Sequence, residues 1–122
     1  MFKKALVIDD NDLVRETLKA MLEFLDFEVV VAANGADALE KFKSTKKSFD
    51  VVFVDLIMPN MSGREVIQKL REINPDIKAV ISSGYSDDPA IADYKKLGFK
   101  EILNKPYTLD DLKKILQNIG LL

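Results

Sequence analysis

The sequence contains no histidine and no cysteine among its 122 residues. Without histidine it has no histidine general base, no histidine-ligated zinc and no Ser-His-Asp triad. Without cysteine it forms no disulfide and no thiolate metal site, which agrees with a reducing cytoplasm. Carboxylates, hydroxyls and lysines remain as the reactive groups, and any bound metal should be a hard, oxygen-binding ion such as Mg²⁺.

A strong charge of one sign and long apolar runs are also missing. The 18 basic and 20 acidic side chains give a net charge of -2, so we expect no direct binding to nucleic acid. Charged residues interrupt every apolar stretch well before the roughly 18 residues of a membrane span, so we expect no membrane insertion and a cytoplasmic location. With 48% apolar residues, the chain should fold, and its length predicts one domain over 1–122.

Five short apolar runs alternate with segments of helical periodicity. The runs are Ala5–Ile8, Val29–Ala32, Val51–Val54, Ile77–Ile81 and Glu101–Leu103. The helical segments are Leu13–Leu25, Ala36–Phe42, Val66–Ile73, Ile91–Leu97 and Leu109–Ile119. This alternation predicts a doubly wound α/β fold with a parallel sheet and helices on both faces. Asn34-Gly35 is typical of a hairpin turn, but the helical period that follows favours a helix N-cap at Asn34.

Polar residues follow four of the predicted strands. They are Asp9 and Asp10, then Asp55, then Ser82 and Ser83, then Lys105. Because ligand sites of open α/β sheets form at the carboxyl ends of the strands, we expect these residues to converge. Two unit charges about 4 Å apart repel by about 4 kcal/mol at an effective dielectric near 20, so the carboxylates need a compensating cation. Carboxylates, a lysine, a hydroxyl and Mg²⁺ together make a phosphoryl site.

Each of these residues alone has an ordinary structural interpretation. Asp9 and Asp10 would cap a helix, Asp55 would start a turn, and Lys105 would be a solvated surface lysine. Their joint occurrence after four strands favours one site over several coincidences.

The motifs that carry these residues resemble the receiver domain of two-component response regulators. They are Ile8-Asp9-Asp10, Val54-Asp55-Leu56-Ile57-Met58-Pro59 with Ser62-Gly63, Ile81-Ser82-Ser83-Gly84-Tyr85-Ser86 and Asn104-Lys105-Pro106-Tyr107. The resemblance implies a five-stranded sheet of strand order 2-1-3-4-5. It also implies a sensor histidine kinase or a histidine phosphotransfer protein as the phosphodonor, and a downstream effector or an attached output domain.

The resemblance also implies a role for each residue. Asp55 matches the phosphoacceptor, Asp10 the direct Mg²⁺ ligand, and Asp9 the acid that assists it. The backbone carbonyl of Ile57 matches a further metal ligand. The remaining matches are Ser83 for the switch hydroxyl, which makes Ser82 the last strand residue, and Lys105 for the lysine that pairs with the phosphoryl group.

Three further expectations follow from the resemblance. The Lys105–Pro106 peptide should be cis, although most X-Pro bonds are trans. The family usually carries a Tyr or Phe three residues before the lysine, where this chain has Ile102, so an aromatic switch at this position is in doubt. Ile57 and Tyr85 stand where bulky side chains would slow the hydrolysis of the acyl phosphate.

Three alternatives remain open at this point. An aspartate-nucleophile phosphohydrolase would carry a second acid two residues after the nucleophile, where this chain has Ile57. A nucleotide-binding domain would need a glycine-rich phosphate loop, and none follows a predicted strand. An interaction domain that is never phosphorylated is the third alternative.

Overall fold

The chain alternates strands and helices along its length. The structure is a computed structural model that describes residues 3–44, 48–84 and 93–122. The elements are β1 (Lys3–Ile8), α1 (Asp12–Phe24), β2 (Phe27–Ala32), α2 (Gly35–Ser44), β3 (Val51–Asp55), α3 (Gly63–Ile73), β4 (Ala79–Ser83), α5 (Tyr94–Leu97), β5 (Glu101–Asn104) and α6 (Leu109–Asn118). The predicted α/β alternation is confirmed.

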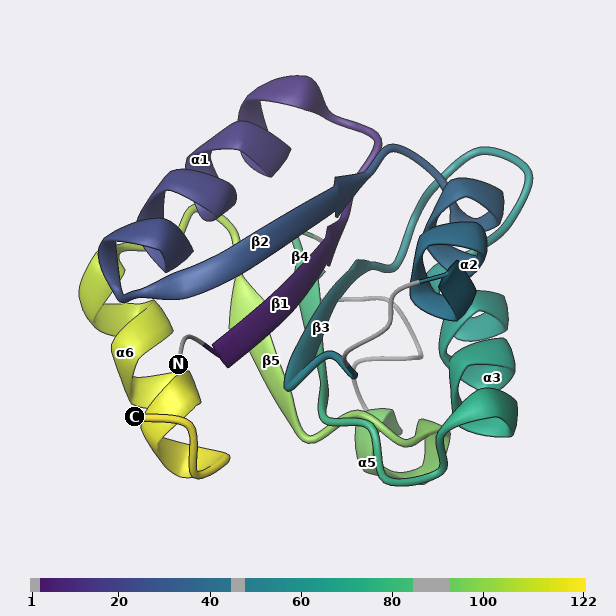
Figure 1. Ribbon diagram of the computed structural model, residues 1–122. Coiled ribbons are helices and arrows are strands. Elements are labelled where there is room, and N and C mark those ends of the chain that lie inside the picture. Colours follow the sequence, from purple (N-terminus) through teal and green to yellow (C-terminus); the bar gives the residue numbers. More distant parts are fainter. Residues whose placement is uncertain (1–2, 45–47, 85–92) are drawn as a thin grey trace.

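The strands form one parallel sheet in the order β2-β1-β3-β4-β5, which confirms the doubly wound topology. Helices α1 and α6 cover one face of the sheet, and α2, α3 and α5 cover the other (Figure 1). Strand β1 pairs directly with β3, so the residues that follow these two strands meet at the same edge. Within the described ranges, no helix combines the length and the apolar composition that a bilayer crossing would need.

The core consists of two apolar clusters, one on each face of the sheet. Successive strand residues point to opposite faces, so Val52 and Val54 belong to the cluster under α2 and α3. Val51 and Phe53 belong to the cluster under α1 and α6. Because β3 is buried on both faces, its residues Val51–Val54 form an uninterrupted apolar run in the sequence.

Polar side chains fix where the helices begin. Asn11 caps α1 by accepting a hydrogen bond from the Val14 backbone N–H at 3.1 Å. Asn34 accepts from the Asp37 N–H at 2.8 Å, which confirms the predicted cap in place of a hairpin turn. Thr108 and Asp111 form a reciprocal capping box at the start of α6.

The predicted position of the fourth strand is wrong by two residues. The strand was expected at Ile77–Ile81, but β4 runs from Ala79 to Ser83. The Ile77 N–H bonds to the Asn74 carbonyl in a turn, and its apolar side chain is buried beside the strand. The strand continues through both serines, so Ser82 is not its last residue.

The predicted helix over Ile91–Leu97 begins outside the described residues, and its described part is α5.

Gly63, the first residue of α3, packs against the end of β3. Its backbone N–H donates to the Leu56 carbonyl at 2.9 Å. A Cβ on Gly63 would lie 2.6 Å from the Asp55 carbonyl oxygen and 2.8 Å from the Leu56 Cα. Both are backbone atoms, so a side chain at this position would push the end of β3 away from α3.

We expect Gly63→Ala to lower the free energy of unfolding by about 1–3 kcal/mol, the usual cost of overpacking. Urea denaturation followed by circular dichroism measures this change. Gly84→Ala is the matched control, because among the described residues its Cβ would meet just the Lys105 Cβ, at an ordinary 3.8 Å. Equal stability of the two variants would show that the chain relieves the contact at Gly63 at no cost.

Candidate functional site

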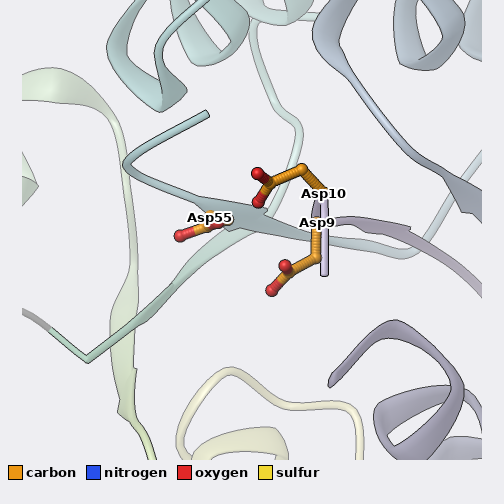
Figure 2. A group of neighbouring side chains, drawn as sticks. All are labelled: Asp9, Asp10 and Asp55. Carbon is orange, nitrogen blue, oxygen red and sulfur yellow. The ribbon is translucent and has the colours of Figure 1, made fainter. Parts of the chain in front are cut away.

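Asp9, Asp10 and Asp55 gather at the carboxyl edge of the sheet. Asp9 and Asp10 directly follow β1, and Asp55 is the last residue of the neighbouring β3 (Figure 2). One carboxylate oxygen from each residue lies within 4.8 Å of the others. Asp9 and Asp55 are 2% and 5% exposed, while Asp10 is open to solvent. The predicted convergence of the three carboxylates is therefore confirmed.

Lys105 brings a positive charge to this cluster from the loop after β5. Its ammonium nitrogen Nζ lies 2.9 Å from Oδ2 of Asp9 and 3.7 Å from Oδ1 of Asp55. The Lys105 backbone N–H donates to the Ser83 carbonyl at 2.8 Å, which extends the β4–β5 pairing as far as the lysine. The Lys105–Pro106 peptide is cis, as predicted.

Asp9 is held at both its carboxylate and its backbone. Oδ1 accepts from the Asn11 N–H at 2.9 Å, and Oδ2 accepts from Lys105. The Asp9 carbonyl accepts from the guanidinium of Arg15 at 2.8 Å, and Arg15 also pairs with Asp12. The spacing of Asp12 and Arg15 on α1 is a signal for their ion pair, but no spacing in the sequence predicts the bond from Arg15 to the Asp9 carbonyl.

The environment of Asp55 disfavours its charged form. Burial raises the pKa of Asp55 to about 6, and the negative charge of Asp9 contributes in the same direction. Lys105 and the Ile57 N–H, which is 3.4 Å from Oδ1, act in the opposite direction. A cation in this cluster would offset the repulsion and favour the ionised carboxylate.

The other residues singled out from the sequence lie in different surroundings. Ser83 is 2% exposed at the end of β4, where its Cα is the partner of Asn104. The Ile57 side chain is 47% exposed on the loop after β3. Ile102 packs against the apolar cluster under α2 and α3. Tyr85 lies outside the described residues.

The acidic cluster has the donor set and the dimensions for a divalent cation. Mg²⁺ binds oxygen ligands at about 2.0–2.1 Å, so ligands on opposite sides of the ion are about 4.2 Å apart. The three carboxylate oxygens span at most 4.8 Å, so small side-chain rotations bring them to that distance. Carboxylate oxygens are hard donors, so they bind Mg²⁺ in preference to a thiophilic metal.

The parallel sheet with its 2-1-3-4-5 strand order and its acidic edge agree with an α/β domain of the receiver type. The model of the response regulator receiver domain family matches residues 5–117. The chemotaxis protein CheY of Thermotoga maritima is 32% identical over 121 residues, which cover 98% of this chain and 99% of CheY.

Solved structures agree with this match. A response regulator receiver domain protein from Clostridium thermocellum is 34% identical with a TM-score of 0.87, over 97% of this chain and 94% of the other. The response regulator TrrA of Thermotoga maritima, in complex with Mg²⁺ and BeF, is 32% identical with a TM-score of 0.84, over 97% and 99% of the two chains. The chain belongs to the response regulator receiver domain family. The match favours a receiver over the phosphohydrolase and the nucleotide-binding domain.

We expect Asp55→Asn to increase stability at pH 7 by on the order of 1–3 kcal/mol, because it removes a buried charge. The folded-state pKa of about 6 lies above the ordinary 3.8, so folding favours the protonated carboxyl. The stability contributed by the protonated Asp55 is complete below pH about 4 and is lost as the pH rises through about 6. Thermal unfolding without divalent cations, between pH 4 and 7, should show this loss in the wild type and not in Asp55→Asn.

The exposed Asp76 supplies the control for this measurement, since Asp76→Asn removes a carboxylate far from the cluster. Its pH profile should follow that of the wild type. A wild-type profile that coincides with that of Asp55→Asn would contradict the raised pKa.

Proposed function

We propose that Asp55 accepts a phosphoryl group from a phosphohistidine and that the modified domain then controls a partner. The donor is a sensor histidine kinase or a histidine phosphotransfer protein, and the reaction takes place in the cytoplasm. The target is a downstream effector or an attached output domain. In this proposal residues 1–122 act as one receiver domain, a signalling module that promotes its own phosphorylation and dephosphorylation.

The observation that carries the proposal is the position of the Asp55 carboxylate. It is buried at the end of β3, with a lysine nitrogen 3.7 Å away and two further carboxylates close by. A structural aspartate needs a positively charged partner but no additional acids beside it. An acceptor that must hold a transferred phosphoryl group together with a cation needs the positively charged partner and the additional carboxylates.

Mg²⁺ fits this cluster, and the relative TrrA was solved with Mg²⁺ and BeF. We propose that Asp10 and Asp55 bind the ion directly, that Asp9 assists them, and that the Ile57 carbonyl is a further ligand. When bound, Mg²⁺ neutralises the charge that three carboxylates and a phosphoryl group bring together.

The chain's own residues supply the remaining chemistry. A carboxylate oxygen of Asp55 forms the new bond to phosphorus while the bond from phosphorus to the donor imidazole nitrogen breaks. Lys105 is already positioned at Asp55 and neutralises the transferred oxygens as a point charge. In this proposal Ser83, buried at the end of the adjacent strand, donates its hydroxyl hydrogen to a phosphoryl oxygen.

We expect acetyl phosphate and Mg²⁺ to add one phosphoryl group to the wild type and none to Asp55→Asn. Intact-mass spectrometry measures the product directly. Asp76→Asn serves as the matched control, because Asp76 is an exposed aspartate far from the cluster. Asp10→Asn should reduce both labelling and Mg²⁺ affinity. Equal labelling of the wild type and Asp55→Asn would place the acceptor elsewhere, and no labelling of either would favour the unphosphorylated interaction domain.

We also expect Ile57→Asn to speed the hydrolysis of phospho-Asp55. The exposed apolar side chain of Ile57 offers no polar group to orient a water molecule, whereas an amide does. A tenfold change needs only about 1.4 kcal/mol. The decay of the phosphorylated form, followed by mass at fixed Mg²⁺ concentration, measures this rate, and Ile57→Val is the conservative control. The parallel prediction for Tyr85→Ala rests on the sequence alone. Unchanged decay in Ile57→Asn would show that this side chain does not limit attack by water.

A further inference from the structure

Two buried hydroxyl groups lie near the acidic cluster without a hydrogen-bond partner. They are Ser82 Oγ and Tyr107 Oη, and neither is paired within the part of the chain that the structure describes. Folded proteins pair nearly all of their buried polar groups, because an unpaired one loses its bonds to water and gains none. Two such groups beside one reactive site therefore call for a functional explanation.

The two hydroxyls lie on the same side of the sheet. Val80 on β4 belongs to the apolar cluster under α1 and α6, and residues two apart on a strand share a face, so Ser82 also faces that side. Tyr107, which follows β5, packs against the same cluster. In the sheet the Ser82 Cα pairs with that of Asp55, so the Ser82 hydroxyl lies on the strand next to the proposed acceptor.

Asp9 is the negative charge that acts on the Tyr107 phenol. Tyr107 follows Lys105 by two residues, and Lys105 contacts Asp9 at 2.9 Å. Burial, followed by the negative charge of Asp9, raises the pKa of the Tyr107 phenol to about 12, while the Ser82 hydroxyl acts in the opposite direction. Tyr107 therefore keeps its proton at neutral pH and has a hydrogen to donate.

Asp9 shares the Lys105 ammonium with Asp55, the residue to which the proposed reaction adds charge. Among the described residues, Lys105 is the one side-chain cation paired with the Asp9 carboxylate. Its nitrogen is also 3.7 Å from Asp55, where phosphorylation adds negative charge. If the ammonium moves toward the phosphoryl group, Asp9 is left as a 2% exposed carboxylate that has lost one of its donors.

We propose that Tyr107 is a positioning residue for Asp9. Its hydroxyl, held by Ser82, donates a hydrogen bond to the Asp9 carboxylate, directly or through one buried water, when Lys105 turns toward Asp55. This inference rests on the proposed function, because the movement of Lys105 follows the arrival of the phosphoryl group. It also gives the Tyr107 hydroxyl an acceptor that it lacks, among the described residues, while Lys105 contacts Asp9.

Nuclear magnetic resonance of tyrosine tests this contact without relying on activity. The chain has three tyrosines, so labelling with ¹³Cζ-tyrosine gives three signals, which Tyr→Phe variants assign. Beryllofluoride with Mg²⁺ is the probe for the phosphorylated state. We expect the probe to shift the Tyr107 signal in the wild type, and we expect Ser82→Ala to reduce that shift. A Tyr107 signal that does not respond to the probe overturns the inference.

The labelling rate with acetyl phosphate at saturating Mg²⁺ provides the second readout. We expect Tyr107→Phe to be slower by about tenfold, at the lower end of the loss caused by removing groups that orient metal ligands. Its melting temperature should be equal or higher, because the variant removes an unpaired buried hydroxyl. Tyr94→Phe removes a phenol hydroxyl on the opposite face of the sheet and should label at the wild-type rate.

A double variant tests whether the two hydroxyls act together. Ser82→Ala should slow labelling as well, and Ser82→Ala combined with Tyr107→Phe should be no slower than Tyr107→Phe alone. Equal rates for the wild type and Tyr107→Phe would overturn this inference and leave the proposed function intact. Equal labelling of the wild type and Asp55→Asn would overturn both.

Discussion

Like charges at the carboxyl edge of the sheet have to be held together against their own repulsion. Asp9 and Asp55 are almost fully buried, and oxygens of Asp9, Asp10 and Asp55 lie within 4.8 Å. Burial strengthens the repulsion, because there is less water to screen it. The Lys105 ammonium offsets part of it, but the pKa of Asp55 remains raised, first by burial and then by the charge of Asp9. This remaining negative charge favours a cation at the same place, and a bound cation would reduce the repulsion between the carboxylates and an anionic phosphoryl group.

The topology of the sheet holds the three carboxylates and Lys105 together despite this repulsion. Asp9 and Asp55 belong to adjacent parallel strands, so backbone pairing between β1 and β3 brings them together. The β4–β5 pairing brings Lys105 to the same edge from the opposite end of the sequence. Gly63 lets α3 pack closely against the carbonyl of Asp55. The stability of the whole core thus opposes the separation of the three carboxylates.

The fold and the acidic cluster could be predicted because both depend on strong periodic patterns. Apolar runs located the strands, and polar residues after them located the edge. The limits of β4 could not be predicted, because Ile77 and Ser83 break the rule that strand residues are apolar and turn residues are polar. The contact of Arg15 with the Asp9 carbonyl and the unpaired state of Ser82 and Tyr107 depend on side-chain directions, which no periodicity encodes.

The two consecutive serines of β4 divide the surroundings of Asp55 between the two faces of the sheet. Strand alternation directs Ser82 toward α1 and α6 and Ser83 toward α2, α3 and α5. On the Ser83 side, β5 carries Ile102, an aliphatic residue with no ring to reorient and no hydroxyl to bond. On the Ser82 side stands Tyr107, with a buried hydroxyl. Among the described residues, the aromatic with a buried hydroxyl near the site therefore lies on the α1 and α6 face. Lys105, which contacts both Asp55 and Asp9, is the group through which we propose that a change of charge at Asp55 affects that face.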